Sequence, residues 1–405
     1  MASNGILKDI MNIQPNLNDK LNIKLYDIDD TMENAYKSRK NEVGSWNYLT
    51  SSETSLSNVK HLFKITGSWG KIGDLWLSVN VPANTYVYHT LSSMIKEVKI
   101  NFGSGLGQLL KYTGEQLDML MCHLNKKVIS DLLLDLQGNT AVISSATTLC
   151  IPLFMLGSKL LFSEEEDLYN NVFHVYKCVN DIEIEITLWP LANFVTSGAN
   201  STGTVELFFK QYDYLSEEII PNKGGIVVPK LYIMPDLYTD TVTFSATALT
   251  EYSYTANNVK NDGEVEEIQV KIAPVSTYAA TAPLYYTTAE LSNLKFTLKN
   301  TNVYEGFNPN WMRAMYLNEY GHDNVMKVNA TDYRFYVIDL SETPKFVYTQ
   351  GSLGTVGINF AKENPVIKVT PTTGSSTSTQ LWIQYVYKSI YTIDKFGIVK
   401  KFLKY

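Results

Sequence analysis

Two stretches near the carboxyl end carry the pattern that decides the fold. Residues 333–369 read YRFYVIDLSETPKFVYTQGSLGTVGINFAKENPVIKV, and residues 381–405 read LWIQYVYKSIYTIDKFGIVKKFLKY. Both are rich in aromatic and β-branched residues, which favour β-strands. Pro344 and the spaced glycines interrupt the runs, and such residues mark turns. The pattern therefore predicts a series of strands joined by turns up to the end of the chain.

Alternating apolar residues predict further strands in both halves of the chain. An apolar residue at every second position gives a strand one buried and one exposed face. The clearest case is residues 182–188, where isoleucines alternate with acidic residues. The other alternating runs lie at residues 75–81, 98–102, 205–209, 242–244, 268–272, 294–298, 335–337 and 381–385.

Two helices are expected among these strands, one in each half. Thr113 and Gln116 have the spacing of a capping box at the start of the first helix. Apolar residues at helical spacing follow, namely Leu117, Leu120, Met121, Leu124 and Val128. The sequence Asn308-Pro309-Asn310 opens the second helix, WMRAMYLNEYGH, and Gly321 is expected to end it.

Both halves thus have the same order of elements: alternating strands, one helix, and more strands. Proline and paired glycines in PNKGGIVVP, residues 221–229, indicate a linker between the halves. Residues 1–55 are polar with scattered apolar positions, which is typical of a terminal arm. We therefore divide the chain into an arm (1–55), a first β domain (56–220), a linker (221–229) and a second β domain (230–405).

The composition argues against several classes of protein. The 405 residues carry a formal net charge of -7, whereas a surface that binds nucleic-acid phosphates is normally basic. No direct nucleic-acid binding is expected. The 27 tyrosines and 16 phenylalanines suit large contact surfaces. The three cysteines, Cys122, Cys150 and Cys178, lack the close spacing of a metal site or a disulfide framework.

Targeting and membrane signals are also not evident. Residues 1–20 lack the basic region followed by an apolar run that forms a secretory signal. The longest apolar run, residues 149–156, is far shorter than the roughly 20 residues that a spanning helix needs. We therefore expect a soluble chain.

One motif points to an enzyme. Asp27-Ile28-Asp29-Asp30-Thr31 follows an apolar stretch and resembles the first motif of haloacid-dehalogenase-type phosphatases. That resemblance implies Asp27 as the nucleophile, Asp29 as the general acid and base, and Mg²⁺ as the phosphate-binding ion. The family also needs a parallel α/β sheet and a distal acidic pair, and the rest of the chain reads as antiparallel β. A phosphatase is the least favoured function.

Other candidate sites are weaker. Residues 103–107, GSGLG, lack the third glycine of a dinucleotide-binding loop and fit a tight turn. The acidic run 164–167 fits a solvated loop, because consecutive acids cannot all face one ion. The five histidines are isolated from one another in the sequence. We expect no catalytic residue, no cofactor-binding residue and no metal ligand, and no cofactor.

Several blocks, in order, resemble the double jelly-roll major capsid proteins of large nucleocytoplasmic DNA viruses, virophages and tailless phages with an internal membrane. In residues 88–124 a strand passes through a glycine-rich turn into a helix. Residues 149–162, LCIPLFMLGSKLLF, and the acid-alternating strand DIEIEITLWPL follow, and the carboxyl-terminal stretches complete the set. The resemblance implies an all-β fold of two consecutive eight-stranded antiparallel jelly rolls with short loop helices, spanning 56–220 and 230–405.

The same resemblance implies a function without catalysis. Such a protein forms pseudo-hexagonal trimeric capsomers that tile an icosahedral shell, and its location is the virion, after assembly in the host cytoplasm or nucleus. Its expected partners are itself, penton or minor capsid proteins, and an underlying internal membrane. The alternative is a β-sandwich protein for carbohydrate binding or adhesion, which would use exposed aromatic residues such as Trp311 and Trp382.

Overall fold

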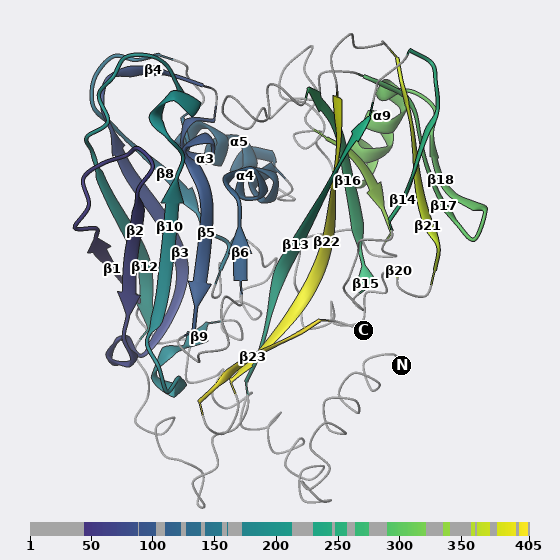
Figure 1. Ribbon diagram of the computed structural model, residues 1–405. Helices are drawn as coiled ribbons and strands as arrows, with labels where there is room; N and C mark the ends of the chain where they lie inside the picture. Colours follow the sequence, from purple (N-terminus) through teal and green to yellow (C-terminus); the bar gives the residue numbers. More distant parts are fainter. Residues whose placement is uncertain are drawn as a thin grey trace, which may run out of the picture.

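Two β lobes lie side by side in the computed structural model (Figure 1). The first lobe comprises the elements between residues 44 and 212, and the second those between 230 and 403. The structure describes residues 44–87, 89–102, 110–122, 127–138, 142–155, 160, 172–212, 230–244, 248–256, 264–274, 290–320, 335–340, 358–360, 363–372, 379–393 and 397–403.

Two antiparallel sheets form the first lobe. One has the order β1 (Gly44–Thr50), β12 (Thr204–Tyr212), β3 (Lys71–Val81), β8 (Thr147–Pro152), with β9 (Phe173–His174) also paired to β3. The other has the order β2 (Lys60–Ile65), β10 (Ile182–Leu188), β5 (Ile95–Asn101), β6 (Leu110–Tyr112). A small sheet joins β11 (Val195–Ser197), β4 (Asn84–Tyr86) and β7 (Val142–Ile143).

The second lobe repeats this plan. One sheet has the order β13 (Lys230–Phe244), β22 (Thr379–Ile393), β16 (Glu267–Pro274), β19 (Tyr336–Asp339), with β23 (Val399–Leu403) also paired to β22. The other has the order β14 (Tyr252–Thr255), β21 (Pro365–Pro371), β17 (Leu291–Leu298), β18 (Thr301–Gly306). A short pair joins β15 (Glu264–Val265) to β20 (Ile358–Asn359).

The pairing is nested in the same way in both lobes. The first strand of each lobe pairs with a strand late in that lobe, β1 with β12 and β13 with β22. The second strand pairs with a strand that comes somewhat earlier in the chain, β2 with β10 and β14 with β21. Nested antiparallel pairing that places successive strands in alternate sheets is the jelly-roll topology. The predicted all-β fold of two consecutive antiparallel jelly rolls is confirmed, and each lobe also carries short strands outside the four-stranded paths.

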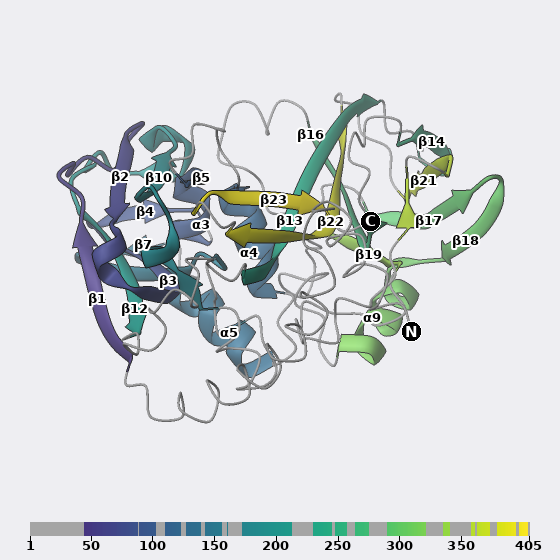
Figure 2. The ribbon, with the colours of Figure 1, turned by 90° about the horizontal axis from the view of Figure 1, so that it is seen from below.

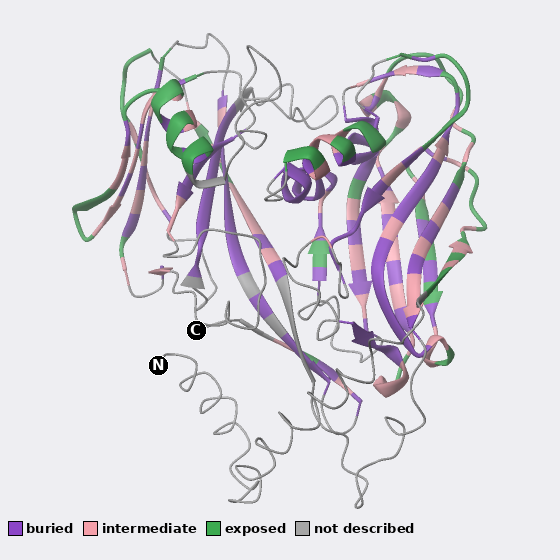
Figure 3. Cartoon of the chain, turned by 180° about the vertical axis from the view of Figure 1, so that it is seen from behind, coloured by how far each residue is buried: buried purple, intermediate pink, exposed green. Residues whose placement is uncertain are grey.

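The alternating sequence runs supply the two cores. Ile182, Ile184 and Ile186 of β10 are fully buried, whereas Glu183 and Glu185 on the opposite face are half-buried. Every predicted alternating run overlaps a strand. Figure 3 shows the buried residues concentrated in the sheets of both lobes. Of the apolar positions predicted to face a core, Val242, Phe244 and Leu298 are only half-buried.

The described helices are α3 (Thr90–Met94), α4 (Gly114–Cys122), α5 (Lys127–Leu136) and α9 (Pro309–Tyr320). The capping box is confirmed, because the Gln116 amide N–H donates to Thr113 Oγ1 (3.2 Å) and the Thr113 amide N–H donates to Gln116 Oε1 (2.9 Å). The start of α9 is also confirmed, with Asn308 Oδ1 accepting the Trp311 amide N–H at 2.9 Å. Its expected end at Gly321 lies outside the described residues.

The prediction of one helix in the first half is wrong, because α3, α4 and α5 all lie there. The apolar stripe that begins at Leu117 does not continue to Val128, which belongs to α5 and is 79% exposed. Every residue of α4 is buried, whereas α5 buries only Ser130 and Leu133, so one helical periodicity does not describe both. Leu124 lies outside the described residues.

The predicted arm is too long. Residues Gly44–Thr50 form β1, which pairs with β12 over its whole length. The run GSWNYLT gives a weak apolar alternation, and main-chain hydrogen bonds to β12 hold it at the edge of the sheet. Asn47 adds a side-chain hydrogen bond to Gln211 (2.9 Å). Residues 1–43 and the predicted linker 221–229 lie outside the described residues.

Gly114, the first residue of α4, has no room for a side chain. A Cβ atom there would overlap the carbonyl oxygen of Ser92 and lie 2.6 Å from that of Ile95. We expect Gly114→Ala to lower the free energy of unfolding by about 2 kcal/mol, because backbone atoms have to move. Urea unfolding measures the change. Gly67→Ala is the control, since its Cβ would meet no atom closer than 3.7 Å; equal effects of the two substitutions would contradict the prediction.

Candidate functional site at the junction of the two lobes

The junction between the lobes is formed by α4 of the first lobe and the outer face of the β13-β22-β16-β19 sheet (Figure 1). In β16, Ile268, Val270 and Ile272 point into the core of the second lobe. Successive side chains of a strand point to opposite faces, so Gln269 and Lys271 point outward, toward the first lobe. Both are nevertheless fully buried, which shows that this sheet is covered on both sides.

A buried ion pair joins the two lobes. The Lys271 ammonium contacts Glu115 Oε1 of α4, and the two residues are 0% and 3% exposed. The Lys271 Nζ atom also lies 4.8 Å from the ring centroid of Trp382 and 5.0 Å from that of Phe335, which adds cation–π contacts. Burial lowers the pKa of Lys271 well below its usual value. The pair fixes the position of α4 on the sheet, because separating the two groups would leave a buried charge without its partner.

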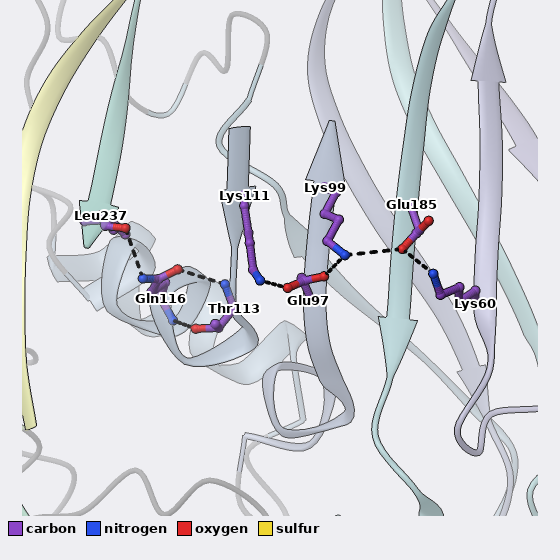
Figure 4. Close-up of polar contacts among 8 residues, drawn as sticks. All are labelled: Lys60, Glu97, Lys99, Lys111, Thr113, Gln116, Glu185 and Leu237. Carbon is purple, nitrogen blue, oxygen red and sulfur yellow. Dashed lines mark hydrogen bonds and ion pairs between the residues drawn. The ribbon is translucent and has the colours of Figure 1, made fainter. Parts of the chain in front are cut away.

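Gln116 connects the start of α4 to the second lobe. Its side-chain Oε1 closes the capping box, while its Nε2 donates to the Leu237 carbonyl oxygen at 3.5 Å (Figure 4). The same Nε2 donates to Thr239 Oγ1 at 3.2 Å. Thr239 and Leu237 belong to β13. One amide therefore sets both the first turn of the helix and its contact with the neighbouring strand.

Apolar residues from each lobe complete the core of the other. Met119 and Cys122 of α4 pack within the core of the second lobe. In the opposite direction, residues of β13, β22 and β23 pack within the core of the first lobe, namely Leu237, Val386, Tyr391, Ile393 and Val399. Figure 2 shows β22 and β23 extending from the second lobe toward the first. The two lobes therefore share their cores.

Two buried tyrosines accompany this shared core. The Tyr112 hydroxyl of β6 donates to the carbonyl oxygen of Pro235 in β13, and the Tyr391 ring lies 6.4 Å from that of Phe102. Burial raises the pKa of both hydroxyls well above the usual value. Both groups stay neutral at physiological pH, which suits their role as packed side chains with a polar end.

The first lobe also contains a buried polar network around His89. Gln137 Nε2 lies 2.6 Å from Asp118 Oδ1 and 2.9 Å from His89 Nδ1, and the Ser92 hydroxyl donates to Gln137 Oε1. All four residues are at most 1% exposed. Although serine, histidine and aspartate occur together, the Ser92 hydroxyl bonds to the amide and not to the imidazole. The network ties the ends of α3 and α5 to α4, which in turn carries Glu115.

An ion-pair ladder covers the outer face of the second sheet of the first lobe (Figure 4). Lys111 and Lys99 both contact Glu97, and Glu185 lies 3.6 Å from Lys99 and 3.0 Å from Lys60. Glu185 of β10 and Glu97 of β5 thus face lysines on neighbouring strands. Ion pairs on a solvent-facing side of a sheet add little stability, and their balanced charges do not form a phosphate-binding surface.

The two tryptophans that the sequence suggests for carbohydrate binding differ in exposure. Trp311 lies on α9 and is 37% exposed, but Trp382 is 2% exposed beneath Lys271. The proposal that Trp382 is an exposed glycan-binding residue is therefore wrong, since the first lobe covers its face of the sheet. Asp27, Asp29, residues 103–107 and residues 164–167 lie outside the described residues.

Within the described part of the chain, no three histidine, cysteine or acidic side chains gather in a way that could hold a metal ion. No described helix is long and apolar enough to cross a membrane.

The fold is similar to that of solved viral capsid structures. The PBCV-1 virus capsid matches with a TM-score of 0.66 at 10% identity, over 90% of this chain and 97% of the other. The Faustovirus major capsid protein matches with a TM-score of 0.61 at 10% identity, over 87% and 91%. The mavirus major capsid protein matches with a TM-score of 0.51 at 9% identity, over 89% and 90%. No protein-family model matches the sequence, and no curated protein is significantly similar to it.

These matches define the class of protein: the chain is a double jelly-roll protein. The two jelly rolls are those seen in the viral major capsid proteins just named, and at 9–10% identity the similarity is one of fold. The resemblance that the sequence blocks indicated is confirmed at this level.

The residues of the junction could not be identified from the sequence. Lys271 stands on the polar side of an alternating strand, where a lysine is normally solvated. Alternation shows which side of a strand faces its own core, but it carries no sign that a second lobe covers the other side. The sequence predicts Gln116 as part of a capping box, but it gives no sign of the hydrogen bonds from the Gln116 side chain to β13.

The Glu115–Lys271 pair is testable by removing one charge and then both. We expect Glu115→Gln to lower the free energy of unfolding by about 3 kcal/mol, because the Lys271 ammonium stays buried without a carboxylate. The combination of Glu115→Leu with Lys271→Met should recover most of that loss, since apolar groups of similar size suit the site. Urea unfolding monitored by tryptophan fluorescence measures both.

The matched control is Glu185→Gln, which removes a half-buried carboxylate from the ladder and should cost less than about 1 kcal/mol. A Glu115→Gln variant as stable as the Glu185→Gln variant would show that the buried pair does not hold the lobes.

Proposed function

We propose that this chain is a viral major capsid protein, located in the virion, that forms trimeric capsomers. The observation that carries the proposal is the presence of two jelly rolls of the same topology, held in one arrangement by a shared core. The fold matches to major capsid proteins support it. We propose a structural role without catalysis.

Geometry links this architecture to tiling. One chain supplies two similar lobes, so three chains around a threefold axis supply six and give a near-hexagonal outline. Hexagonal units pack without gaps on the facets of an icosahedral shell. Because the lobes share their cores, each chain enters the trimer as one body with a defined angle between its lobes.

The finer parts of the proposal concern partners. The net charge of -7 favours a shell that does not bind the genome directly, with a membrane or a separate core beneath it. Penton or minor capsid proteins would complete the vertices and seams. Residues 1–43 are the proposed arm, and they would bind a neighbouring capsomer or the membrane.

Mass in solution tests the main proposal. We expect light scattering behind a sizing column to give three times the 45.7 kDa of one chain, and negative-stain images to show threefold particles with a hexagonal outline. A monomer at every concentration examined, without such particles, would contradict the proposal and favour a carbohydrate-binding or adhesion protein.

Deletion of residues 1–43 tests the arm. We expect the shortened chain to keep its trimer, because β1 begins only at Gly44, but to form few closed shells under conditions where the full chain assembles. Electron microscopy counts the shells. A longer deletion that removes Gly44–Thr50 is the contrast, since it also removes β1 and should impair folding. Normal shells from the shorter deletion would show that the arm has no role in assembly.

A further inference from the structure

A histidine lies in the core of the first lobe, on the inner face of β2. Exposed and buried residues alternate along this strand, and His61, Phe63 and Ile65 are the buried ones. Phe63 and Ile65 belong to the apolar core, and His61 is 0% exposed. Buried polar groups are normally hydrogen-bonded, so the partners of the imidazole decide which charge it can carry.

The two ring nitrogens of His61 have different surroundings. Nδ1 lies 2.9 Å from the hydroxyl oxygen of Ser51. Nε2 is buried, and no atom of the described residues has hydrogen-bond geometry with it. A neutral imidazole has one N–H group and one acceptor nitrogen, whereas a charged imidazole has two N–H groups. The site therefore suits the neutral ring, because a charged ring would bury an N–H group and a charge without a partner.

The charged residues around His61 do not compensate for its burial. Loss of solvent is the largest effect and lowers the pKa of His61, while the main chain of Ser55 and the charge of Glu53 raise it by less. Glu53 itself is exposed. The charged residues of the adjoining strands β2, β10 and β12 point to the outer faces of their sheets, namely Lys60, Lys64, Glu183, Glu185, Glu206 and Lys210.

The segment between β1 and β2, residues 51–58, closes the lobe next to His61. It contains Ser51, which contacts the ring, and Leu56, which is 1% exposed in the core. Its main chain is hydrogen-bonded to β12 and to the connections beside it, in the pairs Ser51–Val205, Thr54–Gly203, Leu56–Ser201 and Asn58–Trp189. The other sides of the ring face paired strands and the core, so water reaches His61 when this segment moves.

We propose that protonation of His61 in mild acid opens the 51–58 segment and thereby loosens one end of the first jelly roll. Opening exposes both ring nitrogens to water, which supplies the partner that Nε2 lacks in the closed state. All parts of this device lie within one lobe of one chain. The inference therefore goes beyond the proposed capsid function and does not depend on it.

The direction of the pH effect follows from the burial of the ring. Above the usual His pKa of 6.5, the ring is neutral in the closed and the open state, and the segment stays closed. Below pH 6.5 the open state takes up the proton more readily, because the closed state holds the pKa of His61 lower. The closed state thus loses stability as the pH falls from 6.5 to the lowered pKa of the closed state.

Hydrogen exchange of the full chain, followed by mass spectrometry, tests the proposal. Exchange of the 51–58 segment is compared at pH 7.5 and pH 5.5, after correction for the pH dependence of the chemical exchange rate. We expect the open population of this segment to rise by about 3- to 10-fold at the lower pH. Residues 75–81 of β3 should keep their protection at both values.

The variant His61→Gln isolates the contribution of the ring. Glutamine does not titrate in this range, and its amide can still hydrogen-bond to the Ser51 hydroxyl. We expect the open population of the 51–58 segment in this variant to be the same at pH 7.5 and pH 5.5. His61→Asn serves the same purpose if His61→Gln does not fold. The matched control is Glu53→Gln, which removes the nearby charge, keeps the ring and should retain the acid response.

Three results would overturn the inference. The first is a 51–58 segment in the unmodified chain that exchanges alike at both pH values. The second is an equal acid response in His61→Gln, which would assign the effect to another group such as His89 or His174. The third is a loss of protection in β3 as large as that in the 51–58 segment, since that would be general unfolding. None of them bears on the capsid function, which the mass in solution tests separately.

Discussion

The constraint on which the rest of the molecule depends is that the β13-β22-β16-β19 sheet is buried on both faces. A jelly-roll sheet normally packs one face on its own core and leaves the other to water. Here the outer face carries Lys271 and Gln269, which need polar partners once they are covered. Helix α4 supplies Glu115 for one of them, and its own position is set by the capping box and by the network of His89, Asp118 and Gln137. The angle between the lobes is thus fixed by polar groups that tolerate few arrangements.

The sequence predicts those parts of the fold that depend on local periodicity. The isoleucines of β10, the capping box of α4 and the start of α9 are all read from residues a few positions apart, and the order of the blocks gives the double jelly roll. The sequence does not predict the first strand, β1, because its apolar alternation is weak. Pairing with β12, which is distant in the sequence, makes this segment a strand. The burial of Trp382 and Lys271 was also missed, since only the three-dimensional arrangement brings the first lobe onto that face.

This chain and the capsid proteins named above share a fold at 9–10% sequence identity, because the fold places only general requirements on the sequence. Nested antiparallel pairing needs alternating apolar residues, turns of suitable length and two faces that meet, and many side chains satisfy each position. The specific residues are concentrated where α4 meets the second lobe and on the surfaces that the fold leaves uncovered.

The length of β13 and β22 has a consequence for biosynthesis. Each strand has 15 residues paired throughout, and the far part of β22 together with β23 packs in the core of the first lobe. Neither lobe is therefore complete until β22 and β23 have left the ribosome. A chain that ends before β22 lacks the strand that pairs with β13 and β16, and it also lacks residues that complete the core of the first lobe. Such a chain exposes apolar surface on each lobe. Only a chain that contains both β22 and β23 can therefore bury the apolar surface of both lobes.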